Sequence, residues 1–96
     1  MTIATCDTIK GPFKIVNKML YPGGMFAGDF DLVKFEDGHA VIVFERVHSD
    51  MIVMDLTEDY LNVMEHYTAH YERPYPPYVR EAPAVFFRNG KGYVIT

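Results

Sequence analysis

Hydrophobic and polar positions divide this chain into short apolar segments separated by turn residues. Apolar segments of four to nine residues with turn residues between them are typical of β-strands. The apolar segment 51–56 would pair back onto the segment 39–47 as a meander. We therefore predict a mainly antiparallel sheet from the segments 2–9, 13–20, 30–36, 39–47 and 51–56.

Asp37-Gly38 gives the clearest turn signal in the first half of the chain. A two-residue type I′ turn needs positive φ at both central residues, and Asp-Gly supplies it. A hairpin closed there pairs Phe35 with Ala40 and places one apolar set on the core side, namely Val33, Phe35, Ala40, Ile42 and Phe44. The opposite side is mixed and could form a dimer interface through Leu32, Val41 and Val43.

Residues 57–72 show a spacing of three and four instead, which predicts an amphipathic helix. Thr57 is placed as its N-cap, acidic residues follow in the first turn, and Pro74 ends it. The expected core stripe of this helix is Tyr60, Leu61, Val63, Met64, Tyr67 and Tyr71.

Beyond the helix, four prolines in 73–83 predict extended backbone, and Asn89-Gly90 predicts a hairpin between 84–88 and 92–96. The chain of 96 residues suits one domain spanning 1–96. The expected fold class is α+β. It has a mainly antiparallel sheet of five to seven strands, one amphipathic helix (about 57–72) packed on one face, and a C-terminal hairpin (84–96).

Composition narrows the function classes. Seven Tyr and seven Phe argue against intrinsic disorder, and a net charge of −4 without clustered Lys and Arg makes nucleic-acid binding unlikely. No apolar run reaches the roughly 20 residues of a membrane span. The single Cys6 excludes a disulfide scaffold, and the first residues after Met1 lack a signal-peptide pattern. We expect a complete small protein of the cytoplasm.

His66 and His70 are the weak candidates for a metal site, because a helix would point two imidazoles four residues apart in the same direction. A third ligand could come from His48, His39 or an Asp. The more economical interpretation is a pair of boundary histidines covering apolar surface, and we expect no cofactor.

Other candidate chemistry is weaker still. Cys6 could form a thiolate nucleophile with a histidine, but it has no flanking signature. The glycine-rich stretch 21–28 lacks the helix that a phosphate loop needs. A small enzyme working at a dimer cleft stays open as an alternative.

The segment 73–80 holds tyrosine and arginine on backbone stiffened by proline, and these residue types are enriched at binding hot spots. The sequence therefore favours a non-enzymatic module that binds a larger protein partner. It could be an inhibitor or modulator, such as a phage or mobile-element product that antagonises a host or defence enzyme. The alternative is a small metal- or ligand-binding protein using His66 and His70. The expected partner-binding residues are Arg73, Tyr75, Tyr78, Arg80, Glu65, His66 and His70.

Overall fold

The computed structural model describes residues 1–72 and 80–96, and in these ranges it is built almost entirely of strands. One short 3-10 turn, η1 (Pro22–Gly24), precedes the third strand. The strands are β1 (Ile3–Thr5), β2 (Lys14–Asn17), β3 (Ala27–Lys34), β4 (Ala40–Arg46), β5 (Asp50–Leu56), β6 (Val63–His70), β7 (Ala84–Arg88) and β8 (Lys91–Ile95).

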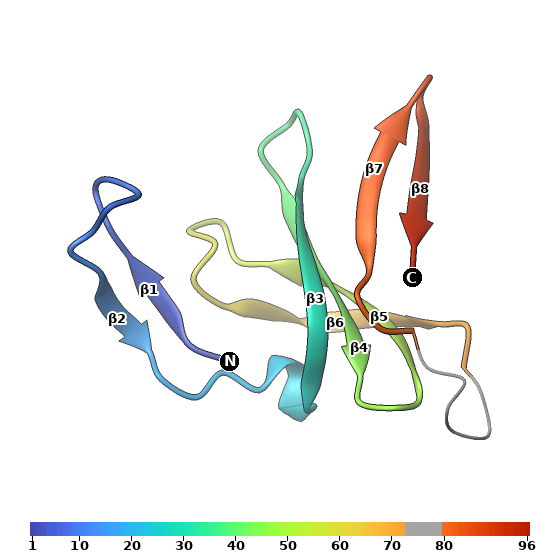
Figure 1. Ribbon diagram of the computed structural model, residues 1–96, viewed down its shortest axis with the longest axis horizontal. Coiled ribbons are helices and arrows are strands. Elements are labelled where there is room, and N and C mark those ends of the chain that lie inside the picture. Colours follow the sequence, from blue (N-terminus) through green and yellow to red (C-terminus); the bar gives the residue numbers. More distant parts are fainter. Residues whose placement is uncertain (73–79) are drawn as a thin grey trace.

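These strands form three antiparallel sheets. The central sheet has the order β3-β4-β5-β6, so each strand pairs with its neighbour in the chain. The β1–β2 hairpin stands at one end of the molecule and the β7–β8 hairpin at the other, with β7 running beside β3 (Figure 1). The meander predicted for the apolar runs 39–47 and 51–56 is confirmed, with Val43 opposite Val53.

The predicted helix 57–72 is wrong, and with it the α+β fold class. Residues Val63–His70 form β6, which pairs antiparallel with β5 and places Tyr67 opposite Met54. The free edge of β5 offers a row of backbone donors and acceptors, and pairing with it outweighs a local helical spacing. The tyrosines expected in a helix core are exposed instead, Tyr67 by 47% and Tyr71 by 66%.

The segment before β6 explains how the chain avoids the helix. The Thr57 hydroxyl does accept a backbone N–H, as a cap would, but the donor is Asn62 at 3.2 Å, five residues further on. Asp59 Oδ1 accepts the N–H of Leu61 at 3.1 Å, and Tyr60 has a positive φ of 62°. Short polar side chains that bond nearby backbone favour turns over helices.

The β3–β4 hairpin forms, but its register is one residue from the prediction. Gly38 N–H donates to Phe35 O at 3.0 Å and Phe35 N–H donates to His39 O at 2.8 Å, so the loop has three residues rather than two. Lys34, not Phe35, therefore pairs with Ala40. A slip of one residue moves side chains to the other face, and it separates Val33 and Phe35 from the predicted core partners Ile42 and Phe44.

At the C-terminus the hairpin does follow its turn signal. Asn89 and Gly90 have φ of 51° and 71°, as a type I′ turn requires, and Arg88 pairs with Lys91. The second strand thus begins at Lys91, one residue before the predicted start.

The core lies on both faces of the central sheet. We call one the Val43 face, with buried Val33, Val41, Val43 and Met51, and the other the Phe44 face, with buried Ile42, Phe44, Ile52 and Met54. On the first, Val85 of β7 covers the cluster, and Val85 N–H donates to Asp31 Oδ2 at 2.8 Å. On the second, Met1 and Met25 pack against the cluster. Of the residues on the mixed side of the predicted hairpin, Val41 and Val43 are buried within the chain and Leu32 is exposed.

Within the described ranges, no helix has the length and apolar character needed to span a membrane.

Candidate interaction surface

The molecule exposes more surface than its size requires. Its accessible area is 7189 Å² for 11.0 kDa, whereas a folded monomer of this mass exposes about 5,600 Å². Its radius of gyration is 14.2 Å, against about 12.5 Å for a compact chain of this length. Large apolar side chains are among the exposed residues: Phe30 is 50% exposed and Leu32 is 58% exposed. Apolar side chains that gather in one exposed patch are typical of proteins that bury the patch against a partner.

A groove in this surface lies between the β1–β2 hairpin and the Phe44 face. Its volume is about 460 Å³. Two hydrogen bonds hold Met1 and Leu20 together in one wall of the groove. Leu20 N–H donates to Met1 O at 2.9 Å, and the Met1 amino group donates to Leu20 O at 2.8 Å. The apolar residues that line the groove are Met1, Ile3, Ala4, Leu20, Phe30, Leu32, Ile42, Leu56, Leu61 and Val63.

The loop 57–62 makes the opposite wall. The Tyr60 hydroxyl donates to Gly38 O at 2.6 Å, which ties this loop to the β3–β4 turn. Hydrogen bonds from the Thr57 hydroxyl and the Leu61 N–H hold the pKa of Asp59 below its ordinary value. Asp59 thus stays ionised and bonded to its own loop at neutral pH, which makes it a poor general base for the groove.

The predicted partner-binding residues fall into three groups. Arg73, Tyr75 and Tyr78 lie outside the described residues. Glu65 and His66 are exposed on β6, an edge strand of the central sheet.

The third group does come together at the end of β6. The Arg80 guanidinium lies 5.7 Å from the centre of the Tyr71 ring, and the His70 ring centre is 6.1 Å from that ring. Tyr71 was predicted to lie in the core beneath a helix, but its ring lies next to both the Arg80 guanidinium and the His70 ring.

The strand also removes the reason for pairing His66 with His70 as metal ligands. In a strand, residues four apart lie about 13 Å from each other along the chain, too far for one ion to bind both side chains. His70 Nε2 lies 2.8 Å from the Thr68 hydroxyl instead. His39 contacts Asp55 at 3.0 Å, and His48 contacts Glu45 at 3.3 Å, so neither lies in a set with His66 and His70.

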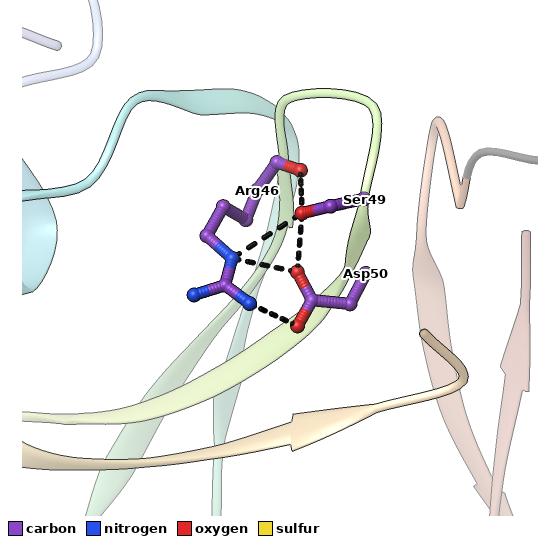
Figure 2. Close-up of polar contacts among 3 residues, drawn as sticks. All are labelled: Arg46, Ser49 and Asp50. Carbon is purple, nitrogen blue, oxygen red and sulfur yellow. Dashed lines mark hydrogen bonds and ion pairs between the residues drawn. The ribbon is translucent and has the colours of Figure 1, made fainter. Parts of the chain in front are cut away.

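The β4–β5 turn contains a closely bonded group of three polar side chains (Figure 2). The Arg46 guanidinium donates two bonds to Asp50, from Nε at 2.7 Å and from the terminal nitrogen at 2.6 Å. The Ser49 hydroxyl lies 2.7 Å from the same carboxylate. Asp50 is 1% exposed, and its bond raises the pKa of Arg46 further above its ordinary value. This clamp fixes the turn that carries His48.

Around the two remaining candidates, residues 1–72 and 80–96 place no set of catalytic or metal-binding side chains. Cys6 is an exposed free thiol in the loop after β1. Within the glycine-rich stretch, Pro22–Gly24 forms the short η1 and β3 follows, as expected for a connection between strands.

Comparison of the chain with protein-family models, with curated proteins and with solved structures finds no match.

The groove was not predicted from the sequence. Its residues come from β1, β3 and the loop 57–62, and the helix prediction had hidden the last of these in a core stripe. The one available signal was Leu32, an apolar residue on what was predicted to be the mixed side of the first central hairpin.

Proposed function

We propose that the protein is a non-enzymatic binding module that docks on a larger protein partner through the groove beside the Phe44 face. The observation that carries the proposal is the exposed pair Phe30 and Leu32, standing at a groove whose walls are mostly apolar. A pocket of about 460 Å³ accepts one large apolar side chain of a partner, with the surrounding surface closing around it.

The extent of the exposed surface supports a protein partner over a small ligand. The accessible area exceeds that of a compact monomer by about 1,600 Å². A standard interface takes about 800 Å² from each partner, so the exposed surface is large enough for a specific complex.

The cellular role that we propose is inhibition or modulation of the partner in the cytoplasm, in the manner of a phage or mobile-element antagonist of a host or defence enzyme. An exposed free thiol at Cys6 fits a reducing compartment. The antagonist role rests on the small size and acidic charge of the chain.

A charge placed in the groove should abolish binding without unfolding the protein. Leu32→Glu introduces a carboxylate at a side chain that is 58% exposed, so the monomer can hydrate it, whereas a partner that covers the groove cannot. We expect the affinity for the partner to fall at least ~100-fold, since burying an unpaired charge costs several kcal/mol. The measurement is affinity capture from cells of the source or its host, followed by calorimetry with the purified partner.

Ile95→Glu is the matched control, because Ile95 is 61% exposed on β8 and does not line the groove. It should retain the captured partner. Equal capture by wild type and Leu32→Glu would contradict the proposal. Light scattering on the protein alone supplies a second check: a dimer that Leu32→Glu dissociates would mean that the groove binds a second copy instead.

A further inference from the structure

Three side chains with metal-binding atoms meet beside the β4–β5 turn, apart from the groove. They are Glu45 near the end of β4, His48 in the turn, and Glu81 in the segment that leads to β7. One ring nitrogen and one oxygen from each carboxyl lie within 4.8 Å of one another. Donor atoms around a single zinc ion are about 3–3.5 Å apart, so a side-chain adjustment of about 1.5 Å completes the geometry.

Two of the three donors are already held in place by the fold. Glu45 is 3% exposed, and its Oε1 accepts the His48 N–H at 2.9 Å. The other oxygen, Oε2, lies over Gly28, where an added Cβ would come within 2.5 Å of it. His48 has a positive φ of 61°, which turns its ring toward Glu45, with Nδ1 at 3.3 Å from Oε1.

The two carboxylates of this cluster would attract a cation. Glu45 and Glu81 bring two carboxylates together, one of them buried, and like charges at this separation repel. The arginine of the turn, Arg46, is bonded to Asp50 instead. A divalent ion between the carboxylates and the imidazole would replace this repulsion by attraction.

We propose that Glu45, His48 and Glu81 bind a divalent first-row transition-metal ion, with zinc as the probe. One imidazole and two carboxylates are a ligand set that such ions accept, and water would fill the remaining position. The ion joins the β4–β5 turn to the segment before β7. That segment already rests on β3, since Ala82 N–H donates to Asp29 Oδ2 at 3.2 Å. The site therefore strengthens the attachment of the β7–β8 hairpin to the central sheet.

The test is zinc titration of untagged, chelator-treated full-length protein by calorimetry, together with thermal unfolding with and without zinc. We expect one ion per chain and a rise in Tm of at least about 4 °C at saturating zinc. Glu81→Gln and His48→Asn should each weaken zinc binding by at least the ~10-fold that loss of even an outer-shell partner costs. Glu81 is exposed, and asparagine tolerates the positive φ at position 48, so both variants should fold.

The matched control is His39→Asn. His39 also lies near two carboxylates, Asp37 at 3.8 Å and Asp55 at 3.0 Å, but these face opposite ring nitrogens and form no such cluster. This variant should bind zinc as the wild type does. Absence of zinc binding to the wild type, or unchanged affinity in Glu81→Gln or His48→Asn while their apo Tm stays near wild type, would overturn the proposal.

Discussion

Phe44→Ala should lower the free energy of unfolding by about 3–5 kcal/mol, the range for removing a fully buried phenylalanine. Phe44 is 0% exposed and lies at the centre of the Phe44 face, beside Ile42, Ile52 and Met54. The strands on both sides hold its backbone, so the surrounding side chains cannot close the cavity that the ring leaves. Urea unfolding followed by circular dichroism measures the change, read as a lower midpoint at constant slope.

Phe30→Ala is the matched control, because Phe30 is directly opposite Phe44 in the β3–β4 pair and is 50% exposed. Its loss should cost about 1 kcal/mol or less, since half of the ring is already in water. The same variant should weaken partner binding, because Phe30 lines the groove. A similar loss of stability in both variants would mean that β3 and β4 are not paired in this register.

Asp50→Ala should destabilise the protein by about 2–3 kcal/mol. Removing one member of a buried ion pair costs about 3–5 kcal/mol, but the Arg46 side chain is 36% exposed and water can solvate part of the freed guanidinium. The Ser49 hydroxyl also loses its carboxylate acceptor. Thermal unfolding at neutral pH measures the effect.

Asp55→Ala provides the comparison on the same strand. The Asp55 side chain is 47% exposed and its partner His39 is 48% exposed, so this pair should contribute less than about 1 kcal/mol. If Asp50→Ala were no more harmful than Asp55→Ala, the Arg46 clamp would not stabilise the turn. In that case His48 would also lose the support that places it beside Glu45.

Turn chemistry accounts for what sequence reasoning predicted well. Asn89-Gly90 places both residues at positive φ, and the hairpin around it formed with a shift of one residue in the second strand. Asp37-Gly38 was a true turn signal as well, but only Gly38, with φ of 91°, takes a positive value. Asp-Gly serves both a two-residue turn and a three-residue loop, so it could not decide the register on its own.

The helix prediction failed for a different reason. Residues 63–70 support two periodicities: Val63, Met64, Tyr67 and Tyr71 recur at helical spacing, while Val63, Glu65, Tyr67 and Ala69 alternate with the rest as in a strand. The choice between them depends on β5, a neighbour whose edge needs a partner, and no local spacing reports that need. The groove and the cluster of Glu45, His48 and Glu81 were missed because each brings together residues from elements far apart in the chain.

The meander order of the central sheet also bears on how the chain folds. In the central sheet β3 pairs with β4, β4 with β5 and β5 with β6, across short connections such as 47–49 and 57–62. Short connections cost little loop-closure entropy, and proteins rich in sequence-local pairings fold faster than those built on distant ones. We expect the central sheet to assemble first, strand by strand. The two terminal hairpins, each also formed from adjacent segments, would then dock onto a surface that already exists.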